Sequence, residues 1–338
     1  MRRVLEAAMV GAGAYALYDQ RQEVGQAARL FAHLRWEWVL LACAAELASM
    51  VIFARLQRWL LRVGGVDLDL WPMVEITLAG NALAVSLPGG AAWSAGFAFE
   101  QLRRRGASRA LSVWVVLVAG ALSSFALFVV LVVGVELAGG RGPARDFRVA
   151  GAVLAAIPIA AGMLGLAAWR SAAVRSALGS AGSWGARHLP KGETIGRLLR
   201  SAWEHVTIVR PTVFDWAASG GMAVTNWLYD GGCLVASMYA VGASVPWPGV
   251  LVAYGVAQVG ASLPITPGGL GIVEGSLSYA LILYGVPVKD AVASVLLYRI
   301  ISFWSLVPVG WGAWGVLELA GRRGRSSARP HPWAWHHS

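Results

Sequence analysis

Long apolar runs alternate with short arginine-rich segments along most of this chain. Several runs reach about twenty residues or more, which is the length that a helix needs to cross the hydrocarbon core of a bilayer. They predict membrane-spanning helices at residues 36–56, 107–137, 149–169, 213–241 and 290–319. An earlier run, at residues 4–18, is short for a span, so either the chain begins late or this helix is marginal.

Two further apolar regions are interrupted. Residues 71–105 break at the Pro-Gly-Gly of positions 88–90, and residues 247–284 break at the proline- and glycine-rich stretch 264–271. Proline lacks a backbone donor and glycine disfavours a helix interior, so neither region forms one continuous span. Broken backbone at membrane depth is tolerated only where protein buries it or where it lines a polar cavity. We therefore expect two re-entrant helical hairpins, each with a candidate site at its break.

The two interrupted regions share short identical stretches, which predicts an internal repeat. Trp-Pro, Ser-Leu-Pro and Gly-Gly each occur in both, at 71–72 and 247–248, 86–88 and 262–264, and 89–90 and 268–269. The copies lie 176 residues apart up to the shared proline and 179 apart after an insertion of three residues. A repeat that contains a broken hydrophobic element in each half is typical of transporters.

The arginines decide the expected orientation. The positive-inside rule places those at 55–62, 103–105, 170–210 and 322–325 in the cytoplasm, together with both chain termini. Three full crossings separate the hairpins, which then enter from opposite faces. We predict an all-α polytopic membrane protein with one membrane domain (1–325), an eight-helix-type bundle of about six spans and two re-entrant hairpins in an inverted-topology repeat. Its expected location is a bacterial-type cytoplasmic membrane.

Composition supports this class. With 57% hydrophobic and 14% charged residues, the chain of 338 residues is too apolar for a soluble domain. The formal net charge of +10 fits the positive-inside pattern and anionic lipids better than nucleic acid. Within the basic segment 170–210, residues 193–209 form either an amphipathic helix on the membrane surface or a solvated loop. The tail, 326–338, is rich in proline, serine and histidine and is expected to be disordered.

Seven residues of the span at 213–241, most of them polar, follow one another at steps of three or four positions, which places them on one helix face. They are Asp215, Ser219, Met222, Asn226, Asp230, Cys233 and Ser237. One interpretation is a wet groove or bundle interior that binds substrate, because a polar stripe facing lipid is costly. The other is helix–helix packing through small polar side chains.

Glu274 and Arg299 are ionisable residues at membrane depth in the second half of the chain. Such groups usually pair or line a pathway. They are expected to form a mutual pair, or Arg299 contacts a lipid phosphate while Glu274 modulates it, since guanidinium matches phosphate oxygens. The remaining interpretation is a buried salt bridge that only fixes the hairpin.

The first hairpin offers a weaker set of candidates, Glu75, Asn81, Pro88, Gly89 and Gly90. A Pro-Gly-Gly tip frees backbone amides, and the positive end of a half-helix dipole favours an anionic headgroup there. Glu100, on the returning leg, is expected to pair with the nearby arginines rather than to bind substrate.

Motifs for catalysis are close to absent. The six histidines lack metal-ligand spacing, and nothing resembles a phosphate-binding P-loop, so neither a metal nor another cofactor is expected. The Asp-x-Asp at 67–69 is a short motif that we treat as incidental. Cys43 and Cys233 fall within apolar runs and indicate no disulfide framework.

The run Leu-Pro-Ile-Thr-Pro-Gly-Gly-Leu-Gly-Ile-Val-Glu-Gly at 263–275, with an arginine at 299, resembles the lysylphosphatidylglycerol synthase transmembrane-region family. The resemblance covers about residues 30 to 320. It implies an eight-helix-type membrane domain that binds and translocates lipids. The motif positions that carry over are Pro264, Thr266, Pro267, Gly268, Gly269, Gly271, Glu274 and Arg299.

The sequence departs from this family in two respects. The soluble aminoacyl-transferase domain of full-length synthases is missing, so synthesis of an aminoacylated lipid is not expected. Ala119-Gly120 occupies the position in the first half that Tyr298-Arg299 occupies in the second. Because of these departures, the identity of the substrate does not follow from that of better-known family members.

Our leading hypothesis is a flippase for a lipid with an anionic or aminoacylated headgroup. The alternative is a non-catalytic subunit that presents a lipid to a separate transferase, and a homo-oligomer is a further possible arrangement. A third hypothesis, a lipid-modifying enzyme, lacks a recognisable set of catalytic residues.

Overall fold

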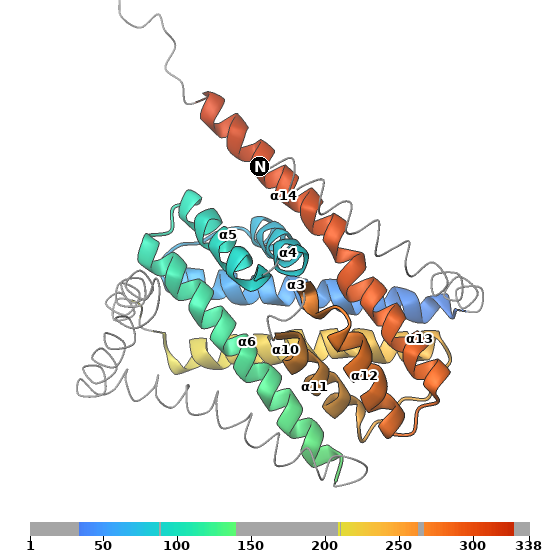
Figure 1. The fold of residues 1–338 in the computed structure, drawn as a ribbon. Helices are drawn as coiled ribbons and strands as arrows, with labels where there is room; N and C mark the ends of the chain where they lie inside the picture. The colour runs from blue at the N-terminus through green and yellow to red at the C-terminus, as the bar shows by residue number, and fades with distance from the viewer. Residues whose placement is uncertain (1–33, 88, 140–208, 210, 263–266, 328–338) are drawn as a thin grey trace, which may run out of the picture.

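The computed structural model describes residues 34–87, 89–139, 209, 211–262 and 267–327. Every regular element within these residues is helical, as the apolar runs predict (Figure 1). The expectations for residues 4–18 and 149–169, and for nearly all of the basic segment 170–210, lie outside the described part. So do those for Pro88, Pro264 and Thr266 and for the tail after Ser327.

The described helices fall into two series with the same order of lengths, long, short, short, long. The first series is α3 (Trp36–Val63), α4 (Leu70–Ser86), α5 (Gly90–Arg104) and α6 (Arg109–Leu137). The second is α10 (Val213–Ala240), α11 (Val250–Ser262), α12 (Ile272–Leu283) and α13 (Val288–Arg299), which continues through a π-helical turn, η2 (Ile300–Trp304), into α14 (Leu306–Ser327). The starts of α6 and α13 differ by the 179 residues that separate the later identities in the sequence.

The first helices of the two series, α3 and α10, pack side by side in opposite directions (Figure 1). At one end, the Arg35 backbone N–H donates to the Ala240 carbonyl at 3.0 Å. Near the middle, Asn226 donates to Ser49. At the other end, the Trp59 and Phe214 rings meet edge to face at 6.0 Å. The equivalent helices of the two series are therefore antiparallel.

The last helix of each series packs against a short helix of the other series. The short helix α4 packs against α14, while its counterpart α11 packs against α6. Glycines allow both approaches: a Cβ at Gly310 would lie 2.3 Å from the Leu78 carbonyl oxygen, and one at Gly134 would lie 2.9 Å from the Leu251 Cβ. Small residues at such crossings are the usual means by which membrane helices pack closely.

Three helical segments are long and apolar enough to cross a membrane, counted over the described residues: Trp36–Val63, Arg109–Leu137 and Val288–Leu319. Large apolar side chains such as Leu40, Leu47, Leu117 and Val133 are exposed along the first two, as expected of surfaces that face lipid. The helix α10 is equally long but carries the polar stripe, and it is not among the three.

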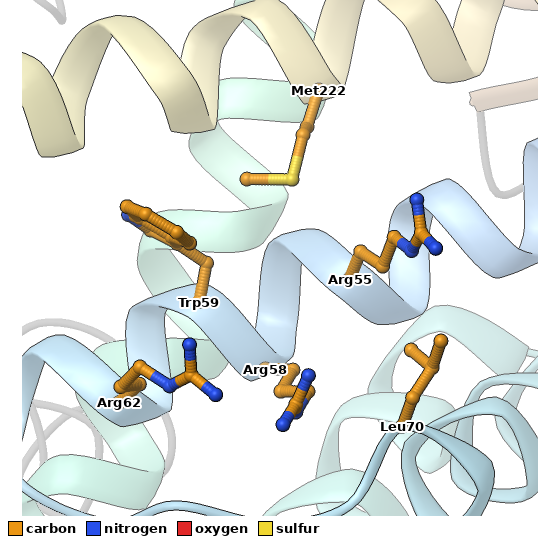
Figure 2. A pocket seen from close by; sticks show the side chains of 6 residues that line it. All are labelled: Arg55, Arg58, Trp59, Arg62, Leu70 and Met222. Carbon is orange, nitrogen blue, oxygen red and sulfur yellow. The ribbon is translucent and has the colours of Figure 1, made fainter.

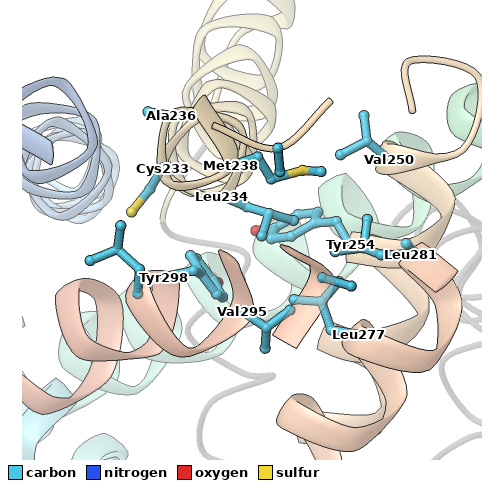
Figure 3. Close-up of a cluster of buried hydrophobic side chains, with 14 of the residues drawn as sticks. Cys233, Leu234, Ala236, Met238, Val250, Tyr254, Leu277, Leu281, Val295 and Tyr298 are labelled. Carbon is cyan, nitrogen blue, oxygen red and sulfur yellow. The ribbon is translucent and has the colours of Figure 1, made fainter. Parts of the chain in front are cut away.

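Each interrupted region is a pair of short helices joined at the predicted break. In the first, α4 ends at Ser86 and packs on α5, which begins at Gly90. In the second, α11 and α12 pack together on either side of a short 3₁₀ turn, η1 (Pro267–Gly269). The interior where α10, α11, α12 and α13 meet is filled by Leu234, Met238, Leu277, Leu281 and Val295 (Figure 3).

Candidate functional site

The break of the second hairpin depends on three glycines with left-handed backbone. Gly268, Gly269 and Gly271 have φ of 59°, 69° and 80°, a region in which a side chain is strained. Gly268 also has no room for one, because a Cβ there would lie 2.1 Å from Cε2 of Phe303. These residues are motif positions from the sequence, and the structure gives each a conformational reason. Pro267 belongs to the same turn, η1.

The predicted Glu274–Arg299 contact is present. Arg299 Nε donates to Glu274 Oε1 at 2.7 Å, and its Nη2 donates to the Gly268 carbonyl at 3.1 Å. The second Glu274 oxygen accepts the backbone N–H of Gly271 at 2.7 Å, which satisfies a free amide at the start of α12. The ion pair thus joins α13 to the hairpin break. Its side chains are 9% exposed for Arg299 and 24% for Glu274.

Arg299 is the last residue of α13, where the helix changes to a π-helical turn. The Ser305 N–H bonds to the Ile300 carbonyl at 2.8 Å, a five-residue step. The guanidinium carbon lies 4.2 Å from the centroid of the Phe303 ring, in cation–π contact. Arg299 is therefore held by a carboxylate, a carbonyl and a ring. Single π turns within helices occur often at functional sites, and nothing in the sequence pattern predicted this one.

A second polar cluster surrounds Asp230 on α10. Its carboxylate accepts hydrogen bonds from the hydroxyls of Tyr254 at 2.5 Å and Tyr298 at 2.9 Å, and from the Gln258 amide at 3.0 Å. Gln258 also donates to the Tyr298 hydroxyl at 2.8 Å. Figure 3 shows both tyrosines among apolar side chains between α10, α11 and α13. The cluster ties together three helices of the second series.

Glu46 of α3 belongs to the same cluster. It is 3% exposed and its carboxyl group lies within hydrogen-bonding reach of Asp230. The antiparallel register of α3 and α10, which brings Ser49 to Asn226, places these two carboxyl groups opposite each other. Its Oε2 atom accepts no hydrogen bond within the described residues. A carboxyl group buried in this way is costly and marks a candidate functional position.

The sequence predicted Asp230 but missed its partners. Glu46 could have been found as the only carboxylate between Trp38 and Leu61. Tyr254 and Gln258 stand four residues apart, so they share a face of one helix. Tyr298 precedes Arg299, but only the fold shows that it turns to Asp230 while Arg299 turns to the hairpin break.

The polar stripe on α10 serves different purposes along its length. Asp215 lies in the first turn, where it accepts hydrogen bonds from the Thr212 backbone and hydroxyl and caps the helix. Asn226 donates both amide hydrogen bonds to Ser49, at 3.1 Å and 2.6 Å, which is the helix-packing role. Fifteen residues, about 22 Å along a helix, separate Asp215 from Asp230. The structure therefore does not bring Asp215 into either cluster.

The first hairpin resembles the second in backbone but not in chemistry. Gly89 has φ of 65° before α5, and a Cβ at Gly90 would lie 1.8 Å from the Ala84 carbonyl oxygen. Glu75 is half-buried on α4, and the Asn81 side chain makes no hydrogen bond with another described residue. Glu100 pairs with Arg104 at 3.1 Å, as expected.

At the repeat spacing, each polar residue of the second hairpin site has an apolar or small counterpart in the first half. Tyr254, Gln258, Glu274, Tyr298 and Arg299 correspond to Leu78, Ala82, Ala95, Ala119 and Gly120. Apart from Glu46 on α3, the side chains of both polar clusters therefore come from the second series of helices. The candidate site is the second hairpin together with α10 and α13.

Comparisons with known proteins agree with the sequence resemblance. A family model described as "Lysylphosphatidylglycerol synthase TM region" matches residues 5–310. A stretch of 49 residues is 45% identical to the UPF0104 membrane protein MJ1078 of Methanocaldococcus jannaschii, and it covers 14% of this chain and 21% of that protein. The chain thus matches about a fifth of that relative's length. Together with the apolar helices, the family match makes this a multi-pass membrane protein.

Proposed function

Since this chain belongs to the lysylphosphatidylglycerol synthase transmembrane-region family, we propose that it translocates a lipid with a polar, phosphate-bearing headgroup across the cytoplasmic membrane. The family match supports the broader statement, that the function is related to membrane lipids. One observation supports the more specific statement, that the protein translocates a phosphate-bearing lipid. A polar site, built from Glu274, Arg299 and the Asp230 cluster, lies inside an apolar bundle at the break of a helical hairpin.

A flippase must shield a headgroup from hydrocarbon while the acyl chains stay in the bilayer. Backbone broken at membrane depth suits this task, because it exposes amides and carbonyls where lipid tails cannot satisfy them. At the second break the Gly268 carbonyl and the Gly271 amide are both occupied by the side chains of the ion pair. Separation of these groups frees hydrogen-bonding atoms for a headgroup.

Arg299 is the residue that we assign to the phosphate. Its planar guanidinium can form two parallel hydrogen bonds with phosphate oxygens. In the present conformation Glu274 and Gly268 take these donors. We assign to Glu274 the role of holding Arg299 when no lipid is bound. In the bound state its carboxylate suits the ammonium of an aminoacylated headgroup.

Alternating access follows from the repeat in this proposal. The antiparallel α3 and α10 and the exchanged contacts of α4 with α14 and α11 with α6 support two inverted halves. Rocking of one half against the other opens the site to one face at a time. The proposal takes both hairpins as re-entrant and both termini as cytoplasmic, on the distribution of arginines.

The second candidate is a membrane subunit that presents a lipid to a separate transferase. It is favoured by the description of the family model, which names the membrane region of a synthase. In both candidates the same site binds the headgroup, and no catalytic step is assigned to this chain.

Proteoliposomes that contain fluorescent lipids distinguish the two candidates. A membrane-impermeant reductant bleaches only labels in the outer leaflet, so translocation appears as a growing bleached fraction. We compare phosphatidylglycerol, an aminoacylated phosphatidylglycerol and a polyprenyl phosphate. Movement of one class well above protein-free vesicles supports the flippase. If no class moves while lipids still co-purify with the folded protein, the presenting subunit is the better account.

A further inference from the structure

A second basic site lies away from the hairpin breaks, at the far end of α3. A cavity of about 240 Å³ is lined by Arg55, Arg58, Trp59 and Arg62 of α3, Leu70 of α4 and Met222 of α10 (Figure 2). The arginines follow steps of three and four residues, so their side chains leave one face of the helix. Figure 2 shows Trp59 and Met222 on one side of this row and Leu70 on the other.

The positive charge of this pocket is only partly neutralised. Arg62 pairs with both oxygens of Asp67, at 3.1 Å and 3.2 Å, and Arg58 approaches the same carboxylate at 3.4 Å. Arg58 Nε also donates to the Leu68 carbonyl at 2.5 Å. Arg55 is exposed, and its guanidinium makes no hydrogen bond or ion pair with another described residue. Two of the three guanidinium groups therefore share the Asp67 carboxylate, and the third, that of Arg55, does not contact it.

The length of α3 places this pocket at the level of lipid headgroups. A helix of 28 residues is about 42 Å long, whereas the hydrocarbon core is about 30 Å thick. The apolar part of α3 begins at Trp36, so the last two turns, from Arg55 to Arg62, extend beyond the core. Basic pockets between helices at the cytoplasmic surface are suited to anionic headgroups.

We propose that this pocket binds the phosphate of an anionic membrane lipid. Arg55 provides the open guanidinium, Arg58 provides a further donor, and Trp59, Leu70 and Met222 form the apolar wall that the glycerol and first acyl carbons contact. None of these residues belongs to α11, α12 or α13, so this is a separate site. It does not depend on translocation by the second hairpin.

Native mass spectrometry of the full chain, released from detergent micelles, measures this binding directly. The probes are phosphatidylglycerol, phosphatidylcholine and inorganic phosphate. Arg55→Gln removes a positive charge without breaking any contact described above, so it is the primary variant. Phosphatidylglycerol is expected to bind tighter than phosphatidylcholine, and Arg55→Gln to weaken it on the order of tenfold, the loss of one charge-assisted contact. Arg55→Lys is expected to recover only part of the lost lipid affinity, since lysine keeps the positive charge but lacks the forked guanidinium that binds two phosphate oxygens.

Two matched variants separate site binding from general charge. Arg109→Gln removes an exposed arginine at the start of α6 that does not line the pocket, and it is expected to leave lipid binding unchanged. Asp67→Asn removes the competing carboxylate and is expected to tighten binding several-fold. Equal weakening by Arg109→Gln and Arg55→Gln overturns the proposal. Binding of inorganic phosphate without phosphatidylglycerol, or a weaker lipid affinity in Asp67→Asn, overturns it as well.

Discussion

Replacement of Gly268 by alanine tests whether the second hairpin break is held in one conformation by its packing against Phe303 of the π turn η2. The φ of 59° costs an alanine about 1–2 kcal/mol. The new Cβ would also lie 2.1 Å from Cε2 and 2.8 Å from Cζ of Phe303. That ring cannot move freely, because it stacks against the Arg299 guanidinium. Overpacking of this kind costs about 1–3 kcal/mol.

Together these effects predict that Gly268→Ala lowers the free energy of unfolding by about 2–5 kcal/mol. The measurement is unfolding of the purified protein in mixed micelles as the fraction of dodecyl sulfate rises, followed by tryptophan fluorescence. Phe303→Leu removes the atoms that the new Cβ meets. The double variant is therefore expected to be about 1–2 kcal/mol more stable than the sum of the single changes predicts.

Gly275→Ala is the matched control. Gly275 lies in α12, and a Cβ there meets nothing within 4 Å, so alanine is expected to be neutral or to stabilise by about 0.5–1 kcal/mol. A Gly268→Ala protein that is no less stable than Gly275→Ala would contradict this expectation. So would a double variant in which Phe303→Leu does not offset the Gly268 substitution, since the steric contact would then be without consequence.

Two other contacts have measurable consequences for stability. Asn226→Ala removes two hydrogen bonds to Ser49 and is expected to lower the free energy of unfolding by about 1–2 kcal/mol, as measured in the same micelles. A decrease as small as that caused by replacing an exposed serine with alanine would contradict the helix-packing role of Asn226. Tyr298→Phe leaves Asp230 and Gln258 without their shared hydroxyl and is expected to cost about 1–2 kcal/mol. The exposed Tyr279→Phe should stay within about 0.5 kcal/mol, and equal effects of the two tyrosine changes would argue against the cluster.

Much of the fold could be predicted from the sequence because membrane helices leave a strong local signal. The apolar runs at 36–56, 107–137, 213–241 and 290–319 predicted the helix starts to within two residues, and the two Pro-Gly breaks became helix ends. The basic ends of α3 and α14 continue as helix to Val63 and Ser327, beyond the predicted ends at 56 and 319. The identities between residues 71–90 and 247–269 also match the two helix series. The π turn after Arg299 left no such signal, because its register depends on the packing of Phe303 and α14 rather than on residue type.

The contacts of the site could be predicted from the sequence only in two cases. Either the residues lie on a single helix, or they are among the few charged residues in apolar segments, so that few pairings are possible. Glu274 and Arg299 are rare ionisable residues in apolar segments, so their pairing was expected. The stripe on α10 shared a face, but the face alone could not tell the cap at Asp215 from the buried contact at Asn226. The Asp230 cluster needed the crossing of four helices, which spacing along a single helix does not contain.

The central claim is that the second hairpin break moves a lipid headgroup, and Glu274→Gln tests it most directly. Glutamine keeps an oxygen for the Gly271 amide but removes the charge that holds Arg299. The measurement is the initial rate of lipid translocation in proteoliposomes, for wild type, Glu274→Gln and Gly275→Ala at equal amounts of folded protein. The account predicts that Gly275→Ala matches wild type while Glu274→Gln is at least about tenfold slower, a difference of about 1.4 kcal/mol. Equal rates for all three proteins, or no transport by wild type, would contradict it.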